Sequence, residues 1–238
     1  MSSCEAILTT AYLPNIQYMS KILGGRPVLI EIQDTYQKQS YRNRATILGA
    51  NGPLDLIIPV KRPFGNRTKT CDVLLDYDTH WMQIHWKAIV SAYKHSPFFD
   101  IFEEEFCTIY QQRKKYLIDW NSYILETIAT ITGESLNINY TKIYEKISGN
   151  SLNDYRTSIH PKRRMQEPDP YFDSHPYFQV FSNKFGFIPN LSFVDLLFNE
   201  GPQAAFLCRS AYKKDDISHP KTCFLQNFYN ILESESDG

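Results

Sequence analysis

Short apolar runs separated by turn residues open the chain. Residues 5–10 (EAILTT) form a run of strand length, residues 16–23 (IQYMSKIL) have helical spacing, and residues 27–32 (PVLIEI) form a second apolar run. Gly24 and Gly25 follow the helical segment, as glycines often do at a helix end. The pattern predicts a strand, a short helix and a buried second strand in a β-α-β order. No G-x-G-x-x-G run accompanies them, so this order does not by itself indicate a dinucleotide site.

Between residues 42 and 61, apolar and polar side chains alternate on both sides of Asn51-Gly52. If this dipeptide forms a two-residue type I′ turn, Ala50 lies opposite Pro53. One face then collects Ala45, Ile47, Leu54, Leu56, Ile58 and Val60. The other face carries Arg42, Arg44, Thr46, Asp55 and Lys61. A slip by one residue would mix these two sets, so the pattern predicts an antiparallel hairpin in this register.

Helical spacing dominates the middle of the chain. Residues 80–93 (HWMQIHWKAIVSAY) predict a helix that carries His85 on its apolar stripe. The same spacing predicts two further helices over residues 102–112 and 115–132, the second of them ended by Gly133. Short strands are expected at residues 71–77 and 135–140. Helices and strands are therefore mixed along the chain.

Residues 159–176 predict a long loop, because they contain four prolines and the basic run Lys162-Arg163-Arg164. A loop of this length is usually a binding loop, a lid or disordered. One interpretation is a lid that closes over the hairpin, and the alternative is a surface loop without a ligand.

Residues 187–212 predict two helices separated by Gly201-Pro202, with Ser192 and Asp195 as an S-x-x-D capping box at the first. Together the elements predict an α/β protein of the mixed α+β kind. We expect a single domain over residues 1–232, with a mixed sheet that includes an antiparallel hairpin and is packed by several helices. Residues 233–238 (ESESDG) are expected to form an acidic, frayed tail.

Composition restricts the kind of partner. The chain has 25 basic and 26 acidic residues and a net charge of -1, which argues against a general binder of nucleic acid or of membrane surfaces. No window approaches about 20 apolar residues, so no membrane insertion is expected, and no signal peptide is recognisable. The five cysteines form no C-x-x-C pair, which favours reduced thiols and a cytoplasmic location.

Local charge departs from this balance around the hairpin. Between Gln37 and Lys69 the only acid is Asp55, against seven basic residues. The basic residues are Lys38, Arg42, Arg44, Lys61, Arg62, Arg67 and Lys69. Guanidinium groups held on one strand face bind phosphate or carboxylate well. The alternative is a solvated sheet face, or cations that pair with acids elsewhere in the chain such as Glu103-Glu104-Glu105.

Two polar residues stand out on apolar faces. Asn43 needs hydrogen-bond partners if it is buried, and these are supplied either by the loop geometry or by a ligand. His85 is either a general base with a tunable pKa or a core histidine whose hydrogen bonds are satisfied. The six histidines show no H-x-x-x-H, H-E-x-x-H or Cys-His spacing, so we predict no metal site and no cofactor.

Four blocks occur in an order that resembles the WbqC-like protein family. They are AYLPN, YQKQSYRNRATILGANGPLDLIIPVKR, WMQIHWKAIVSAYKHSPFFD and FGFIPNLSFVDLLFNEGP, and they span roughly residues 6–201. The resemblance implies a bacterial cytoplasmic protein of surface-polysaccharide (O-antigen-type) biosynthesis, with acyl or aminoacyl transfer to an amino sugar as the suspected reaction. One element departs from the family pattern, because Tyr12-Leu13-Pro14 stands where the family has His-Gln-Pro.

The residues and the resemblance together define the expected site. The candidate catalytic residues are His85 and Tyr12. The candidate substrate-binding residues are Lys38, Arg42, Asn43, Arg44, Lys61, Tyr93 and Ser96. The first hypothesis is a transferase whose ligand is a nucleotide sugar or another anionic small molecule. The second is a non-catalytic module that recognises an anionic small molecule or a protein partner, and the sequence leaves enzyme status and oligomeric state open.

Overall fold

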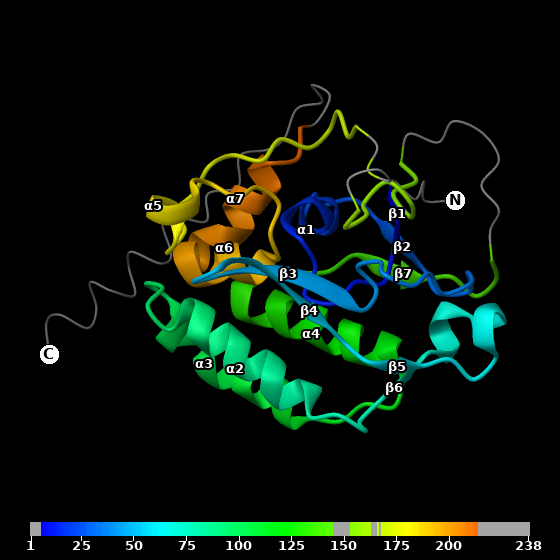
Figure 1. Cartoon of the computed structure of the whole chain (residues 1–238). Coiled ribbons are helices and arrows are strands. Elements are labelled where there is room, and N and C mark those ends of the chain that lie inside the picture. The colour runs from blue at the N-terminus through cyan, green and yellow to red at the C-terminus, as the bar shows by residue number, and fades with distance from the viewer. Residues whose placement is uncertain (1–5, 145–152, 163–165, 167, 214–238) are drawn as a thin grey trace, which may run out of the picture.

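A three-stranded parallel sheet and an antiparallel hairpin form the strand framework, and helices pack around both (Figure 1). The computed structural model describes residues 6–144, 153–162, 166 and 168–213. The predicted tail at residues 233–238 lies outside them. The mixed α/β class predicted from the sequence is confirmed.

The parallel sheet is built from the beginning and the middle of the chain. Its order is β1 (Ala6–Thr9), β2 (Val28–Glu31) and β7 (Ile138–Tyr140), with β2 in the centre. The helix α1 (Ile16–Ile22) connects β1 to β2, so the predicted β-α-β order is confirmed. Asn15 caps this helix, since its side-chain oxygen accepts a hydrogen bond from the backbone N–H of Tyr18 at 2.9 Å.

A later segment extends the sheet beyond β1. The backbone N–H of Ile7 donates to Asn153 at 2.8 Å, and the N–H of Tyr155 donates to the carbonyl of Ile7 at 2.9 Å. The bridge between Ile7 and Asp154 is parallel. Because this bridge is parallel, residues 153–155 leave the sheet at the same end as β1, the carboxyl end of the strands.

The hairpin consists of β3 (Arg44–Gly49) and β4 (Gly52–Ile57). Gly49 lies opposite Gly52, so Ala50 and Asn51 form the turn and the predicted register is wrong by two residues. A type I′ turn needs positive φ at both central residues, but Ala50 and Asn51 are not among the residues with positive φ, whereas Gly52 has a φ of 107°. The positive-φ position thus falls just after the turn.

The sorting of side chains between the two faces survives this error, because a shift of two residues keeps every side chain on its face. Ala45, Ile47 and Leu56 are buried, as predicted for the inner face. Leu54 is on the same face near the turn but is 43% exposed. The inner face is therefore apolar along its length and covered over only part of it.

Two helical layers enclose the hairpin (Figure 1). On one side lie α2 (Trp81–Tyr93), α3 (Phe99–Gln111) and α4 (Leu117–Thr132). On the other side lie α1, α6 (Phe193–Glu200) and α7 (Ala204–Ser210). The smaller elements are β5 (Val60–Lys61), β6 (Leu74–Leu75), α5 (Ser182–Phe185) and the 3-10 turns Gly65–Arg67, Thr70–Asp72 and Gly201–Gln203. The strand expected at residues 71–77 is thus reduced to β6.

Aromatic side chains join the two layers. The Phe198 ring on α6 lies 5.2 Å from those of Tyr93 and Phe99 and 5.0 Å from that of Phe106. Edge and tilted contacts of this kind add stability beyond the apolar area that they bury. Buried apolar residues from Ala6 to Cys208 form one cluster. No helix in the described ranges is both long and apolar enough to cross a membrane.

The predicted capping box at α6 is wrong. Ser192 is the N-cap residue, but its hydroxyl donates to the carbonyl of Leu13 at 2.8 Å and makes no cap hydrogen bond. Asp195 is 1% exposed, and its side chain points to other partners in the core. The S-x-x-D pattern is present, but both side chains form hydrogen bonds with residues from other elements instead of capping the helix.

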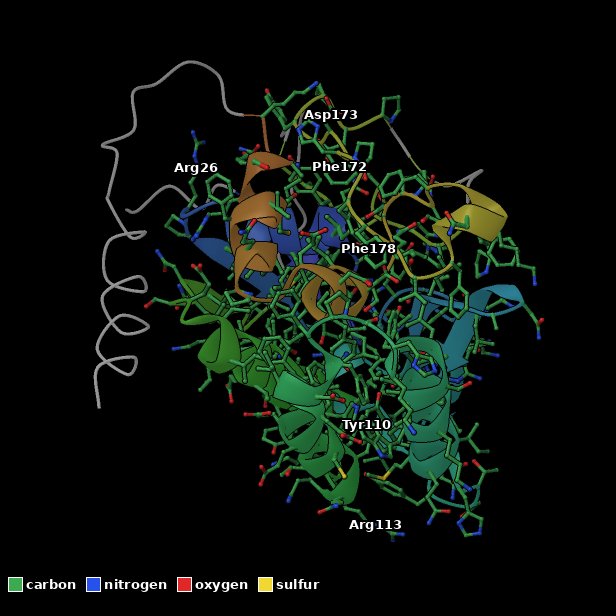
Figure 2. The ribbon with its side chains drawn as sticks, turned by 90° about the vertical axis from the view of Figure 1, so that its left-hand side faces the viewer. Arg26, Tyr110, Arg113, Phe172, Asp173 and Phe178 are labelled. Carbon is green, nitrogen blue, oxygen red and sulfur yellow. The ribbon has the colours of Figure 1, made fainter. Side chains whose placement is uncertain are left out.

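A buried lysine anchors part of the predicted loop at residues 159–176. Lys21 Nζ on α1 lies 2.7 Å from Asp169 Oδ2, and 4.6 Å from the ring centroids of Tyr155 and Tyr212. Phe172 and Asp173, a few residues after Asp169, lie beside the end of α7. Figure 2 shows both at the opposite end of the molecule from Tyr110. This part of the loop is therefore fixed to α1 and α7. Residues 163–165, which include Arg163 and Arg164, lie outside the described residues.

Candidate functional site

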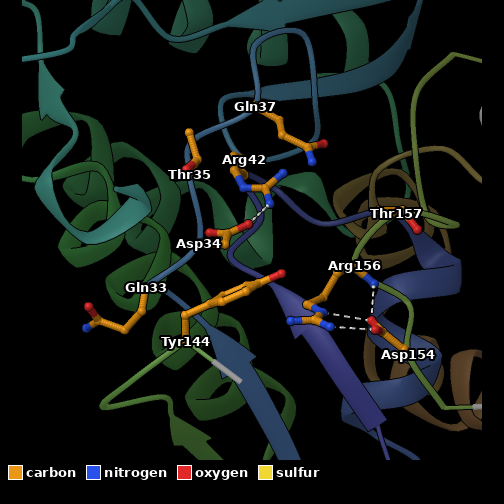
Figure 3. Close-up of a pocket in the computed structure, with 9 residues that line it drawn as sticks. All are labelled: Gln33, Asp34, Thr35, Gln37, Arg42, Tyr144, Asp154, Arg156 and Thr157. Carbon is orange, nitrogen blue, oxygen red and sulfur yellow. Dashed lines mark hydrogen bonds and ion pairs between the residues drawn. The ribbon is translucent and has the colours of Figure 1, made fainter. Parts of the chain in front are cut away.

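A cavity of about 440 Å³ lies at the carboxyl end of the parallel sheet. Gln33 and Asp34 follow β2, Tyr144 follows β7, and residues 154–157 continue the segment beside β1. Figure 3 shows the side chains of Asp34, Tyr144, Asp154 and Arg156 around one space near the strand ends. Open α/β sheets bind their ligands in this position, because the loops after several strands meet there.

Arg42 forms the inner wall of the cavity. Its side chain is 2% exposed and pairs with the carboxylate of Asp34, whose second oxygen accepts a hydrogen bond of 2.5 Å from the Thr70 hydroxyl. The expectation that Arg42 lies on the outer face of the hairpin is wrong. It precedes β3 and turns inward, because a buried guanidinium needs an acid and Asp34 supplies one directly after β2.

Arg156 forms the opposite wall. Its Nε and Nη2 atoms donate to the two carboxylate oxygens of Asp154 at 2.9 and 2.6 Å. Its Nη1 lies 3.5 Å from Glu31 Oε2, and the guanidinium lies 5.7 Å from the centroid of the Tyr144 ring. Glu31 is fully buried and also accepts a hydrogen bond of 2.7 Å from the Thr141 hydroxyl. These contacts orient Arg156 before any ligand arrives.

The charges that line the cavity are therefore balanced. Two arginines, Arg42 and Arg156, face Asp34 and Asp154, and the Tyr144 side chain crosses the space between them (Figure 3). An arrangement of paired donors and acceptors beside an aromatic ring suits a ligand with many hydroxyl groups better than it suits a bare anion.

Arg44, another predicted anion ligand, does not line this cavity. Its Nη1 lies 3.4 Å from Asp55 Oδ2 across the hairpin, and Thr46 donates to the other oxygen of Asp55 at 2.7 Å. Asp55 is 43% exposed, so this ion pair contributes little to stability.

Lys61 also lies away from the lining of the cavity. It belongs to β5, which pairs with β6, and its Nζ lies 3.0 Å from Asp76 and 2.7 Å from Asp78. The predicted placement of Lys61 beside Arg42 and Arg44 is wrong, because β4 ends at Ile57 and the ladder does not continue to β5. The acids that neutralise it come later in the sequence than the basic stretch.

Asn43 fixes the base of the hairpin. Its side-chain Nδ2 donates to the backbone carbonyl of Ile58 at 2.8 Å, and the backbone carbonyl of Asn43 accepts from the N–H of Ile58 at 2.9 Å. Lys38 is exposed on the segment between β2 and β3. Neither residue lines the cavity, and their roles in ligand binding stay predictions.

The two residues predicted to be catalytic do meet. The Tyr12 hydroxyl lies 2.9 Å from His85 Nδ1 and 2.6 Å from the Tyr110 hydroxyl. Tyr12 follows β1, His85 belongs to α2 and Tyr110 belongs to α3, so three elements form one hydrogen-bonded chain in the core. The two residues were expected on separate grounds, and the fold makes them neighbours. Their catalytic role stays a prediction.

Burial determines the chemistry of this chain. It lowers the pKa of His85 to about 4, against a smaller opposite effect of a hydrogen bond to the carbonyl of Ile57. The direction of the hydrogen bond between Nδ1 and the Tyr12 hydroxyl depends on which ring nitrogen carries the proton. Tyr12 is fully buried and His85 is 5% exposed, and neither lines the cavity. The imidazole is thus neutral and shielded.

A second buried network surrounds Asp195. Tyr93 donates to its Oδ1 at 2.8 Å, and Tyr177 donates to its Oδ2 at 2.6 Å. Burial raises the pKa of Asp195 to about 6, although these hydrogen bonds act in the opposite direction. Ser96, predicted with Tyr93 as a ligand of the substrate, is 7% exposed, and its hydroxyl has no partner among the described residues. Tyr93 and Ser96 lie in the core, away from the lining of the cavity.

Sequence reasoning missed most of the cavity. Asp34 carries a usable signal, because it stands just after a predicted buried strand, where site residues of parallel sheets gather. Tyr144, Asp154 and Arg156 carry none, since neither periodicity nor a motif separates them from ordinary loop residues. The pairing of β7 with β2 brings Tyr144 to the sheet, and the pairing of Ile7 with Asp154 brings Asp154 and Arg156.

Comparison with known proteins places this chain in a protein family. A profile described as the WbqC-like protein family matches residues 10–167. The protein named "Uncharacterized protein Rv1507c" from Mycobacterium tuberculosis is 25% identical over 224 residues, which cover 84% of this chain and 94% of the relative. No solved structure matches. The profile match includes all the residues that line the cavity.

Proposed function

We propose that this chain, which belongs to the WbqC-like protein family, binds an activated sugar at the carboxyl end of its parallel sheet and acts in bacterial surface-polysaccharide biosynthesis. The observation that carries the proposal is the cavity of about 440 Å³, in which Arg42 and Arg156 are each held by a carboxylate beside the Tyr144 ring. This volume falls in the range of small-molecule sites.

The lining offers a sugar several contacts. Carboxylate oxygens of Asp34 and Asp154 accept hydrogen bonds from hydroxyl or ammonium groups, and the guanidinium of Arg156 donates. The Tyr144 side chain is 54% exposed and presents its ring as an apolar platform for one face of a pyranose. Of the residues expected from the sequence, Arg42 alone takes part in this site.

The reaction follows from the family resemblance, which implies acyl or aminoacyl transfer to an amino sugar. Tyr12 and His85 are the candidates for proton transfer. Their burial outside the cavity favours a second function, in which the chain recognises the sugar without transforming it. The two functions share the same ligand site.

Calorimetric titration of the full chain with a panel of free sugars, amino sugars and sugar phosphates tests the proposal. Tyr144→Ala should weaken the binding of the sugar found in this way about tenfold, because the loss of one stacking contact is worth roughly 1.4 kcal/mol. Phe206→Ala is the matched control, since Phe206 is 65% exposed on α7 and does not line the cavity. Binding that is equally strong in both variants would place the sugar elsewhere, and the absence of binding to any member of the panel would refute the proposal.

A further inference from the structure

The exposed face of α3 changes from acidic to neutral along the helix, and three cations follow the end of the helix. The opposite face, which includes Phe102 and Phe106, is buried in the core. Figure 2 shows Arg113, just beyond the end of α3, at the opposite end of the molecule from Asp173. We refer to the exposed residues of α3, together with residues 113–115, as the α3 surface.

Acidic side chains occupy the first half of the α3 surface. They are Asp100, Glu103, Glu104 and Glu105, and all four are exposed. None of them forms an ion pair within residues 6–144, 153–162, 166 and 168–213. The helix dipole stabilises acids in the first turn, but only Asp100 lies there. Three consecutive glutamates in the following turn repel one another, and cations from outside the helix would relieve this repulsion.

Three consecutive cations follow the end of α3, and each of them lies over the ring of a tyrosine. The distances to the ring centroids are 4.9 Å from Arg113 to Tyr77, 4.6 Å from Lys114 to Tyr123 and 5.1 Å from Lys115 to Tyr116. Contacts between a cation and an aromatic ring hold the charge in place without neutralising it. Arg113 and Lys115 nevertheless stay exposed.

Hydrogen bonds fix the backbone of the same three residues. The Tyr77 hydroxyl donates to the carbonyl of Lys114 at 2.8 Å and accepts from its N–H at 3.1 Å. The N–H of Leu75 donates to the carbonyl of Lys115 at 3.0 Å. No acid in the described parts of the chain forms an ion pair with residues 113–115. Cations that are ordered in advance lose less conformational entropy when they meet a partner.

A second copy of α3 has the charges that fit this surface. Thr108 is exposed near the middle of the surface, with Glu103 five residues before it and Lys114 six residues after it. Five residues correspond to about 8 Å along a helix, so the acids and the cations lie at similar distances from Thr108. When two copies of α3 run antiparallel about a twofold axis at Thr108, the acids of each copy lie opposite the cations of the other.

We propose that this protein forms a symmetric dimer through the α3 surface, in which residues 103–105 of one copy face residues 113–115 of the other. The interface also covers Ile101, whose side chain is 61% exposed in the single chain. It contains no residue of the cavity lining, so the dimer does not depend on the proposed function. Exposed ion pairs are weak and are screened by salt, so the dimer forms at high protein concentration and dissociates as the ionic strength rises.

Analytical ultracentrifugation of two charge-reversal variants tests this interface. Glu104→Lys and Arg113→Glu should each raise the dissociation constant of the dimer about tenfold or more, because each places like charges opposite one another across the axis. An equimolar mixture of the two variants should recover the affinity of the parent, because each copy then supplies the charge that the other lacks. Mixing cannot rescue a variant that merely fails to fold.

Asp173→Lys is the matched control, because it makes the same change of charge at the far end of the molecule (Figure 2) and should dimerise as the parent does. Added salt should weaken the dimer of the parent. A parent that sediments as a monomer at every concentration up to its solubility limit overturns the inference. A dimer that Glu104→Lys leaves unchanged, or a mixture of the two variants that stays monomeric, overturns it as well.

Discussion

At the scale of single residues, Arg42 shows how a surface charge predicted from a pattern becomes part of the interior. Its guanidinium is almost fully buried, and Asp34 is the acid that compensates it. Removing one partner of a buried ion pair leaves an uncompensated charge in the core, which costs far more than the pair contributes when it is intact. Ion pairs at the surface lack this asymmetry.

Asp34→Ala should therefore lower the free energy of unfolding by about 3–5 kcal/mol, because it leaves the charge of Arg42 buried and removes the acceptor of Thr70. Asp55→Ala, which removes the half-exposed partner of Arg44, should cost less than about 1 kcal/mol. Urea unfolding followed by circular dichroism measures both. Equal costs would mean that Arg42 is not buried as described.

Two buried groups respond to pH in opposite directions. The pKa of Asp195 is raised from 3.8 to about 6, so the folded state retains its proton and stability is lost as the pH rises through this interval. The pKa of His85 is lowered from 6.5 to about 4, so stability is present above pH 6.5 and is lost on acidification. At 1.36 kcal/mol per pKa unit each effect amounts to roughly 3 kcal/mol, and they nearly cancel between pH 4 and 6.

Single substitutions should reveal how each of the two groups makes the free energy of unfolding depend on pH. From pH 4 to 6.5 the free energy of unfolding of Asp195→Asn should rise by about 3 kcal/mol relative to the parent, because only the His85 contribution remains. For His85→Gln it should fall by a similar amount over the same interval. Urea unfolding at a series of pH values gives these curves, and parallel curves for all three proteins would contradict the two shifts.

At the scale of elements, the hairpin separates what a sequence pattern can predict from what it cannot. Alternation assigned its faces correctly, because burial acts on every second residue. The register depended on one dipeptide, and both Asn51-Gly52 and the observed Ala50-Asn51 turn keep the same faces. The pattern could not distinguish two registers that bury the same side chains.

The backbone of Gly52 gives a test of the observed turn conformation. Gly52→Ala should lower stability by about 1–2 kcal/mol, because its φ of 107° is unfavourable for a residue with a Cβ atom. Gly49→Ala is the control across the same pair, since Gly49 does not have positive φ and an added Cβ would meet only the carbonyl oxygen of Gly52 at 3.8 Å. Thermal denaturation compares the two variants, and a larger loss at Gly49 would contradict the backbone conformation described for Gly52.

Helices and strands with long periodic patterns were predictable for the same reason as the hairpin faces. The capping box at Ser192 was not, because Leu13 and Tyr93 compete for the same side chains from distant parts of the chain. Capping rules describe hydrogen bonds between residues close in sequence, and in a buried helix end a partner from elsewhere in the fold can take the place of the local one. The pair of Tyr12 and His85 was likewise predicted as two residues and never as a contact.

At the scale of the whole molecule, the candidate site depends on a sheet whose strands come from separate regions. The cavity takes Asp34 from the end of β2, Tyr144 from the end of β7 and Arg156 from the segment beside β1. No spacing in the sequence encodes this meeting. Charge counting favours the basic stretch, but three of its cations pair with acids: Arg42 with Asp34, Arg44 with Asp55, and Lys61 with Asp76 and Asp78.

The order of strands in this sheet also constrains how the protein is made. During synthesis β1 and β2 can pair early, but β2 keeps an open edge until β7 at Ile138–Tyr140 has left the ribosome. An unpaired strand edge is a template for unwanted association, and contacts between distant segments form slowly. The nascent chain thus carries an unpaired edge of a hydrophobic strand from the end of β2 until β7 is made, and its yield in the cell should depend on chaperones that shield β2 over this interval.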